Sequence, residues 1–349
     1  MSRFGPPGTT RPAWSRTIGL AFWVPVVALA LLSVSVTGYA SADGPVSVTD
    51  FRGKVLRFAQ RPRRILCLIE SAVSGFYMLG TGERLVGVPR NLYDEPLFTR
   101  YAGLDPRIAA RALPSPGSWD FVSLEGVMAL RPDLVVIWSH QTESIAALES
   151  HGIPVFGVFI TSIADVEREM NALGALTGTE SRAAELIAAS RTRTQAIQER
   201  VASIPPAGRP TVYFMWSQGQ LDTSCGGSTV DALIALSGGR NVCAGIAAEH
   251  ATLHLEQLIA WDPQVILMWP NPRLTPAQLR ADPQWQRLSA VRSGRVHQLP
   301  EVFLCDLWTL KYQYAATLVA AWLHPDRFAD LAPEEEAERL LDHLYPAVR

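Results

Sequence analysis

Two segments of this chain share one pattern: Ser123-Leu-Glu-Gly-Val-Met-Ala-Leu-Arg-Pro-Asp-Leu-Val-Val-Ile-Trp138 and His254-Leu-Glu-Gln-Leu-Ile-Ala-Trp-Asp-Pro-Gln-Val-Ile-Leu-Met-Trp269. Each copy predicts a short helix, a proline that ends it, and an apolar strand that closes with tryptophan. A duplicated helix–proline–strand unit indicates two similar lobes. We expect the functional site in the cleft between them.

The regions around the two copies alternate between short apolar runs and helical patterns. The runs that predict strands are Ile65–Ile69, Leu85–Val88, Val155–Val158, Thr211–Trp216 and Arg295–Gln298. Strands that are apolar throughout and alternate with helices are typical of parallel sheets covered on both faces. The sequence therefore predicts an α/β fold, with two lobes that each have a central, mainly parallel sheet flanked by helices.

One long helix is expected to join the lobes. Residues 180–201 are rich in Ala, Glu, Arg and Gln, and Pro205-Pro206 ends the segment. A helix of about 20 residues spans about 30 Å, enough to cross between lobes. We expect an N-terminal lobe over 46–178, a bridging helix over 179–204 and a C-terminal lobe over 205–349.

The first 42 residues have the pattern of a secretory signal. Arg3, Arg11 and Arg16 precede an apolar run over 18–36, and Ala40-Ser-Ala42 supplies a small-residue cleavage site. We predict cleavage after Ala42 and export to a periplasm. An uncleaved membrane anchor is the alternative, because the apolar run is long for a signal.

Charge limits the classes of partner, and the cysteines indicate where a disulfide can form. The formal net charge is −2, and the signal removes only basic residues, so a nucleic-acid partner is not expected. Cys67 falls in an apolar strand and should pack as a small hydrophobic residue. An oxidising compartment would allow one disulfide among Cys225, Cys243 and Cys305, and the sequence does not choose the pair.

Tryptophans mark the candidate ligand site. Trp138, Trp216 and Trp269 each follow a predicted strand directly, and Trp119 and Trp308 fall in loops. The carboxyl ends of parallel strands face the crevice where ligands bind. Stacking on indole suits a large, flat or greasy ligand, so we interpret these five side chains as walls of a binding cleft.

Polar side chains near the same strand ends are candidates for orienting the ligand. They are Ser71, Arg90, Tyr93 and His140. Arg90 follows a strand directly and can clamp a carboxylate or oxyanion, or it can pair with neighbouring acidic residues on the surface.

The sequence contains no pattern of an enzyme or of a resident metal site. No G-x-S-x-G, H-E-x-x-H or catalytic carboxylate pair occurs. His250 and His254 are four residues apart, but no third ligand is evident. We therefore expect a binding protein without a cofactor of its own.

Glu125 and Glu256 occupy matching places in the two copies. A carboxylate in the first turn of a helix is stabilised by the helix dipole, which is a sufficient structural reason for each. Their equivalence suggests a further role, because two carboxylates on two lobes form a symmetric pair that a two-fold symmetric partner can bind through arginines.

Several motifs together resemble one family, the periplasmic substrate-binding proteins of ABC importers that bind iron–siderophores, cobalamin, haem or molybdate and tungstate. The motifs are Arg64-Ile-Leu-Cys-Leu68, Leu85-Val-Gly-Val88, Ser118-Trp119 followed by Leu124-Glu125, Ala129-Leu-Arg-Pro-Asp-Leu-Val135, Gly152-Ile-Pro-Val155, Gly238-Gly-Arg-Asn241 and Leu255-Glu256. The resemblance covers roughly residues 46–330.

The resemblance implies both a function and partners. In the cobalamin-binding relatives, the glutamates at the positions of Glu125 and Glu256 engage arginines on the two transmembrane subunits. Tryptophans line the ligand where Trp119 and Trp138 stand here. We expect a monomeric receptor that captures an iron–siderophore or related metal chelate for an ABC permease. A molybdate or tungstate receptor, or a cobalamin or haem receptor, is the alternative, and an exported hydrolase is a distant one.

Overall fold

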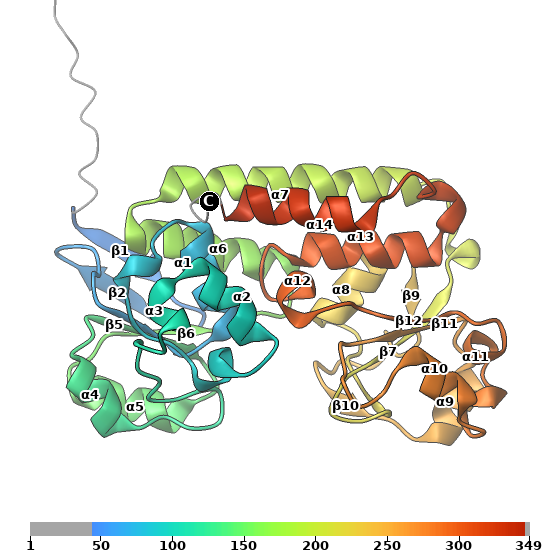
Figure 1. The fold of residues 1–349 in the computed structure, drawn as a ribbon, viewed down its shortest axis with the longest axis horizontal. Coiled ribbons are helices and arrows are strands. Elements are labelled where there is room, and N and C mark those ends of the chain that lie inside the picture. The colour runs from blue at the N-terminus through green and yellow to red at the C-terminus, as the bar shows by residue number, and fades with distance from the viewer. Residues whose placement is uncertain (1–43, 346–349) are drawn as a thin grey trace, which may run out of the picture. The chain divides into compact units, whose positions relative to one another are not determined.

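The computed structural model describes residues 44–345, and the expected signal segment and its cleavage site lie outside them. Two four-stranded sheets, each entirely parallel, form the centres of two lobes (Figure 1). The first has the order β4-β3-β5-β6 and the second the order β12-β11-β7-β9. In both sheets the strand that comes first in the chain lies between the second and the third. The two lobes therefore share one topology, as the repeat predicts.

The strands are short and buried. In the first sheet they are β3 (Ile65–Cys67), β4 (Leu85–Gly87), β5 (Leu134–Trp138) and β6 (Val155–Val158). In the second they are β7 (Thr211–Met215), β9 (Arg240–Asn241), β11 (Val265–Met268) and β12 (Val296–Gln298). Strand β9 is not predicted by the sequence, because two residues carry no recognisable periodicity.

The repeated unit folds in the same way twice. Helix α4 (Leu124–Leu130) leads to β5, and α9 (Leu255–Trp261) leads to β11. Each helix ends on a residue with left-handed backbone, Arg131 at φ 43° and Asp262 at φ 41°. A proline follows in both copies and prevents the helix from continuing. The chain can then turn directly into the buried strand.

The remaining elements cover the sheets. In the first half they are the hairpin of β1 (Val46–Thr49) and β2 (Val55–Phe58), then α1 (Glu70–Met78), η1 (Gly82–Arg84), η2 (Arg90–Tyr93), α2 (Leu97–Leu104), α3 (Pro106–Ala109), α5 (Thr142–Ser150) and α6 (Ile163–Thr177). In the second half they are η3 (Pro206–Gly208), β8 (Asp222–Thr223), α8 (Thr229–Leu236), β10 (Ala251–Thr252), α10 (Pro276–Ala281), η4 (Trp285–Arg287), α11 (Ser289–Arg292), α12 (Val302–Cys305), α13 (Tyr312–Leu323), η5 (Pro325–Arg327) and α14 (Pro333–Leu344).

Helix α7 (Glu180–Val201) is one unbroken helix of 22 residues. At about 1.5 Å per residue it is about 33 Å long. It packs against α6 of the first lobe and against α8 and α13 of the second, and it lies with α13 and α14 on one side of both sheets (Figure 1). The residues it buries are Ala183, Leu186, Ile187, Ser190, Ile197 and Val201. No helix within residues 44–345 combines the length and the apolar character needed to cross a bilayer.

One hydrophobic core is shared by the two lobes. Side chains of both sheets, such as Ile65 and Leu267, belong to a single buried cluster that also includes α7 and α13. The outer face of each sheet has its own smaller cluster. Because interiors are close-packed, a core that continues across the junction resists a large change in the angle between the lobes.

Further contacts join the lobes beside the shared core. Arg100 on α2 donates two hydrogen bonds to the carboxylate of Glu301, at 2.8 and 2.6 Å. The ring of Tyr101 meets the ring of Phe303 edge to face, with 5.2 Å between centroids. These contacts also limit relative motion of the lobes.

Candidate ligand-binding site

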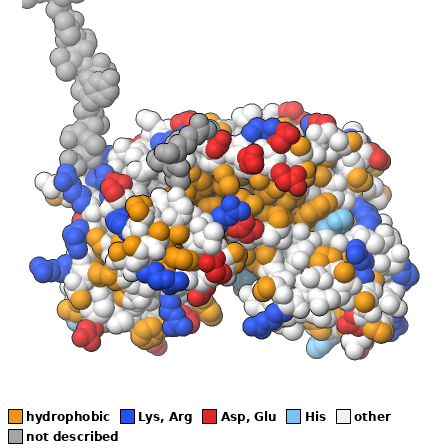
Figure 2. All heavy atoms as spheres, in the orientation of Figure 1, with side chains coloured by type: hydrophobic (Ala, Val, Ile, Leu, Met, Phe, Trp, Pro, Cys, Tyr) orange, Lys and Arg blue, Asp and Glu red, His pale blue; other side chains and the backbone are white. Residues whose placement is uncertain are grey.

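A cavity of about 440 Å³ lies where the carboxyl ends of the two sheets face each other. Lining residues follow β3, β5 and β6 in the first sheet and β7 and β11 in the second, so in each sheet they include the neighbouring pair at which the strand order reverses, β3 with β5 and β7 with β11. This is where open α/β sheets bind ligands. The surface is hollowed between the lobes (Figure 2). The lining residues are Leu68, Glu70, Ser71, Asn91, Leu97, Ser118, Trp119, Trp138, His140, Phe159, Ile160, Trp216, Gln218, Glu249, His250, Trp269, Val302 and Trp308.

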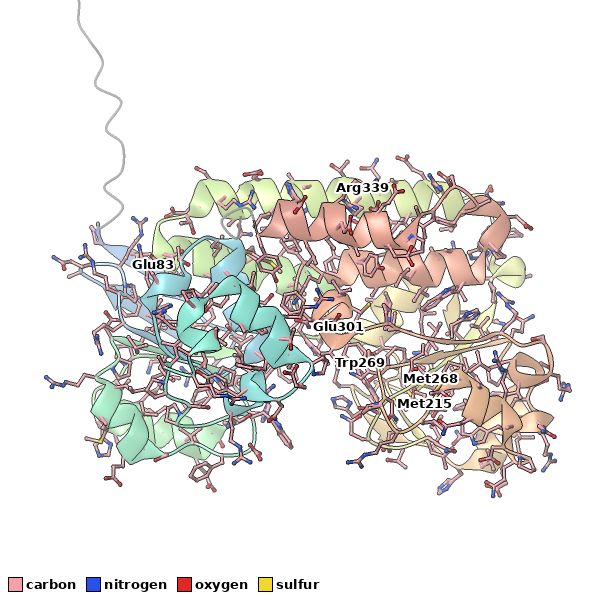
Figure 3. All side chains as sticks on the ribbon, in the orientation of Figure 1. Glu83, Met215, Met268, Trp269, Glu301 and Arg339 are labelled. Atoms are coloured by element: carbon pink, nitrogen blue, oxygen red, sulfur yellow. A yellow bond between two sulfur atoms is a disulfide. The ribbon has the colours of Figure 1, made fainter. Side chains whose placement is uncertain are left out.

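Three indoles of the second lobe form one wall of the cavity. The ring centroids of Trp216 and Trp269 are 5.0 Å apart, and Trp308 stacks on Trp216 at 5.9 Å with 14° between the planes. Trp269 follows β11 directly and points from the end of its strand toward the gap between the lobes (Figure 3). Edge-to-face and stacked contacts hold these rings in place, so the wall is formed before any ligand arrives.

The first lobe contributes Trp138 and Trp119. Trp138 is the last residue of β5 and stacks on His140, with 6.2 Å between centroids and 20° between planes. Trp119 lies in the loop before α4 and is 63% exposed. When the two copies of the repeat are aligned, Trp138 corresponds to Trp269 and Trp119 to His250. Both lobes therefore line the cavity from equivalent positions.

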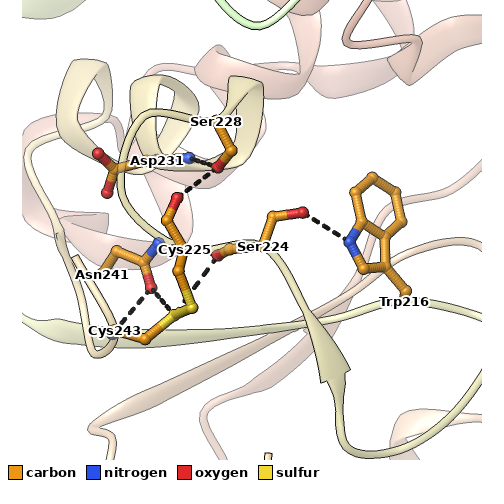
Figure 4. The surroundings of a disulfide bond; sticks show 7 residues. All are labelled: Trp216, Ser224, Cys225, Ser228, Asp231, Asn241 and Cys243. Atoms are coloured by element: carbon orange, nitrogen blue, oxygen red, sulfur yellow. Dashed lines mark hydrogen bonds between the residues drawn. A yellow bond between two sulfur atoms is a disulfide. The ribbon is translucent and has the colours of Figure 1, made fainter. Parts of the chain in front are cut away.

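A hydrogen bond orients the central indole. Trp216 is 4% exposed, and its Nε1 donates to Oγ of Ser224 at 2.8 Å (Figure 4). The next residue, Cys225, forms a disulfide with Cys243, the pair that the sequence left open. Cys67 and Cys305 are buried free thiols.

The disulfide belongs to the segment that carries two further lining residues. The backbone N–H of Cys225 donates to the carbonyl of Ala248 at 2.9 Å, directly before Glu249 and His250. The ring of His250 lies 5.9 Å from that of Trp216. The loop between Cys243 and β10 is thereby held against the cavity.

The cavity contains two carboxyl groups with unusual pKa values. Burial raises the pKa of Glu70 to about 7; the charge of Asp306 raises it further, and Lys311 and the hydroxyl of Tyr101, which donates to Glu70, oppose the increase. Burial raises the pKa of Glu249 to about 7 as well. Both groups therefore change charge near neutral pH.

Two polar atoms at the cavity have no hydrogen-bond partner among the described residues. They are Oγ of Ser71, whose side chain is 4% exposed, and Oε2 of Glu249. A buried polar group without a partner costs about 1–3 kcal/mol. A ligand that bonds to these atoms would remove that cost.

A buried ion pair lies beside Glu70. Nζ of Lys311 is 3.8 Å from Oδ2 of Asp306 and 3.9 Å from the ring centroid of Phe303, and the lysine side chain is fully buried. Burial raises the pKa of Asp306, and the charge of Lys311 opposes this increase. Burial also raises the pKa of the neighbouring Glu169, to about 8.

The structure brings most of the predicted ligand residues together. Ser71, Trp119, Trp138, His140, Trp216, Trp269 and Trp308 all line the cavity. Arg90 and Tyr93, on η2, are not among the lining residues. Arg90 is exposed, and the hydroxyl of Tyr93 donates to the carbonyl of Leu113 at 2.7 Å. Asn91, which follows Arg90 on the same turn, does line the cavity.

Glu125 and Glu256 are exposed in the first turns of α4 and α9. His250 lines the cavity, whereas His254 is the residue that precedes α9. No group of three or more His, Cys, Asp or Glu within the described part of the chain is placed to hold a metal ion.

Sequence reasoning missed Glu249, Gln218 and Phe159. Glu249 and Gln218 lie in loops, where no periodicity identifies a side chain that faces the cavity. Phe159 follows β6 directly, so its place at a strand end was the available signal. Alignment of the repeats was the available signal for Glu249, because it places Glu249 opposite Ser118, which also lines the cavity.

Comparison with known proteins gives a family match and related folds. A family model described as periplasmic binding protein matches residues 65–302. The chain is 23% identical over 311 residues to the molybdate-binding protein MolA of Haemophilus influenzae, covering 81% of this chain and 86% of MolA. It is 24% identical over 212 residues to the vitamin B12-binding protein of Yersinia pestis, covering 60% of this chain and 70% of that relative.

Solved structures share the fold. MolA of Haemophilus influenzae with molybdate bound matches with a TM-score of 0.76 and 19% identity, covering 86% of this chain and 98% of that one. An ABC-type Fe3+-hydroxamate transport system protein of Saccharomonospora viridis matches with a TM-score of 0.62 and 23% identity, covering 80% of this chain and 98% of that one.

Proposed function

The chain belongs to the periplasmic binding protein family of ABC importers, and we propose that its tryptophan-walled cavity captures a metal–organic chelate. The observation that carries this proposal is the pair of aromatic walls, with Trp216, Trp269 and Trp308 on one lobe and Trp119 and Trp138 on the other. Two opposed walls suit a bulky ligand whose organic shell stacks on indole.

The size of the cavity supports a ligand of this class. Its volume of about 440 Å³ falls within the range of about 300–1,000 Å³ that is usual for drug-sized ligands. Among the similar proteins, one is a vitamin B12-binding protein and another belongs to a Fe3+-hydroxamate transport system. Both of these named ligands are metal–organic compounds.

The shared core supports a largely preformed site. Because α7 is unbroken and the core continues across the lobes, we expect only a small closure when ligand binds. Affinity should then depend on the fit of the existing walls rather than on a large conformational change.

Intrinsic tryptophan fluorescence tests the ligand class. Titration with ferric siderophores, haem and corrinoids should change the emission for at least one chelate, and no response to any of them would contradict the proposal. Trp138→Phe should weaken that binding by roughly threefold or more, because stacking on indole is lost. Trp261→Phe is the matched control, since Trp261 packs against the outer core of the second sheet and does not line the cavity.

A molybdate or tungstate receptor is the second candidate. The unpartnered hydroxyl of Ser71 lies in the first turn of α1, where backbone N–H groups favour oxyanions. MolA, a molybdate-binding protein, is a relative. Calorimetry with molybdate separates the two candidates, because tight binding of the bare oxyanion would favour this one.

Glu125 and Glu256 are proposed as the contacts with the permease. Both are exposed at equivalent turns of the two lobes and away from the cavity, since neither is a lining residue. Carboxylates in that setting can pair with arginines of two transmembrane subunits. We propose that the protein is a monomer that delivers its cargo without carrying out a reaction. Analytical ultracentrifugation of its complex with the permease tests the stoichiometry of that complex.

Export is proposed to depend on the first 42 residues. The family implies a periplasmic location. Mass spectrometry of the protein recovered from a periplasmic fraction should give an N-terminus at Asp43. An intact N-terminus retained in the membrane fraction would indicate an anchor instead.

A further inference from the structure

We propose that the cavity selects chelates of neutral or positive net charge and rejects anions. This inference rests on the proposed function and specifies the substrate class of the same site. Its basis is the set of titratable lining side chains, which are Glu70, His140, Glu249 and His250. Lysine and arginine are absent from the side chains that line the cavity within the described residues.

The two carboxyl groups lie on opposite lobes. Glu70 begins α1 in the first lobe, and Glu249 lies in the disulfide-anchored loop of the second. When both groups are ionised, a ligand between the lobes is therefore exposed to negative charge from both sides. A cationic group on the ligand would lie between two carboxylates, whereas an anionic group would be repelled by both.

Unpartnered polar atoms show that the cavity has unused hydrogen-bonding capacity. Ser71 is 4% exposed, and its Oγ has no hydrogen-bond partner among residues 44–345. Oε2 of Glu249 also has none. An ionised carboxylate only accepts hydrogen bonds, so the partner it lacks is a donor, such as an ammonium or amide N–H.

The buried lysine does not reverse this charge. Lys311 is fully buried and is not a lining residue. Its ammonium is paired with Asp306 at 3.8 Å, and Glu70 and Glu169 are further acids in the same buried region. The charge of Lys311 is thus matched by its own partner, and the charge that faces the ligand comes from the carboxylates.

Three charge variants of one chelate test the proposal. They are a linear ferric trihydroxamate with a free terminal ammonium, its N-acetylated neutral form and its N-succinylated anionic form. Calorimetry at pH 8, where histidine is ordinarily neutral, should give binding of the cationic form at least about tenfold tighter than of the anionic form, which corresponds to about 1.4 kcal/mol. Equal or tighter binding of the anionic form, or tight binding of molybdate, would overturn the charge selectivity.

Variants assign the effect to the cavity. Glu249→Gln should reduce the cation-to-anion ratio severalfold, whereas Glu338→Gln, which removes an exposed carboxylate on α14, should leave it unchanged. An unchanged ratio in Glu249→Gln would overturn the role of this carboxylate. In the wild-type protein the ratio should also fall as salt is raised, which needs no variant to fold.

The outcomes separate the two proposals. Failure of all chelates to bind, including corrinoids and haem, would overturn the proposed function and this inference with it. Binding in the reverse order of charge would overturn the inference alone and leave a chelate receptor.

Discussion

The disulfide between Cys225 and Cys243 should contribute measurably to stability. It closes a loop with a sequence separation of 18. The chain-entropy estimate for a loop of this length is about 3 kcal/mol. For a cooperative unit of about 300 residues, this predicts that Cys225→Ala with Cys243→Ala lowers the Tm by about 5 °C.

Loss of the disulfide should also weaken the attachment of a loop that lines the cavity. Backbone hydrogen bonds from Cys225 to Ala248 and from Gly226 to Ile246, at 2.9 and 2.8 Å, hold the loop that carries Glu249. Without the disulfide this loop is held only by such bonds. Ligand affinity should therefore decrease, and limited proteolysis should cleave first within residues 244–250.

Thermal unfolding with and without reductant is the assay. Reductant should lower the Tm of the wild-type protein to that of the double variant and should not change the variant itself. Cys67 and Cys305 are buried and already reduced, so they do not contribute to the difference. Equal Tm values for the oxidised wild type and the variant would refute the reasoning, as would proteolysis that begins elsewhere.

Three further measurements test the electrostatics and the docking contacts. Glu125→Ala combined with Glu256→Ala should abolish uptake, while each substitution changes the free energy of unfolding by only about 0.5 kcal/mol. If calorimetry instead shows weakened ligand binding, the two glutamates belong to the cavity or stabilise the fold. Lys311→Met should destabilise the protein by about 3–5 kcal/mol at pH 8, because it leaves the buried carboxylate of Asp306 without its cation. The loss should become smaller as the pH is lowered, because burial raises the pKa of Asp306 and the lysine no longer opposes this increase. An equal loss in urea unfolding at pH 8 and pH 5 would contradict the ion pair. Burial raises the pKa of Glu70 and of Glu249 to about 7, so the ionised fraction of both groups increases from pH 6 to pH 8. Across this window the affinity for a cationic chelate should rise, and the affinity for an anionic chelate should fall. Affinities that do not change with pH for either ligand would show that these groups do not face the ligand.

Much of the fold could be predicted from the repeat, because the pattern lies within one short segment of the chain. The pattern from Leu124 to Trp138 specifies a helix, a stop and a buried strand within a few residues, and its recurrence at Leu255 predicts a second lobe with the same order. Tryptophans at strand ends could be assigned to a ligand cavity for the same reason, because the direction of a parallel strand determines which edge of the sheet its last residue reaches.

Arg90 shows where such reasoning stops. It lies three residues after β4, on η2, and its side chain is exposed, whereas the next residue, Asn91, lines the cavity. Which side chain of a short turn faces a cavity depends on the local backbone conformation, which apolar periodicity does not specify.

The amino-acid sequence alone determined the two parallel-sheet lobes, the long helix between them and the aromatic character of the site. Each of these features follows from the spacing of apolar residues along the chain. Only the tertiary structure decided that Cys225 pairs with Cys243, that Lys311 is buried against Asp306, and that Glu249 lines the cavity from a loop. The physical reason is that contacts between lobes and loops depend on how whole elements pack in three dimensions. The local sequence around a residue does not identify the distant residue that it will contact.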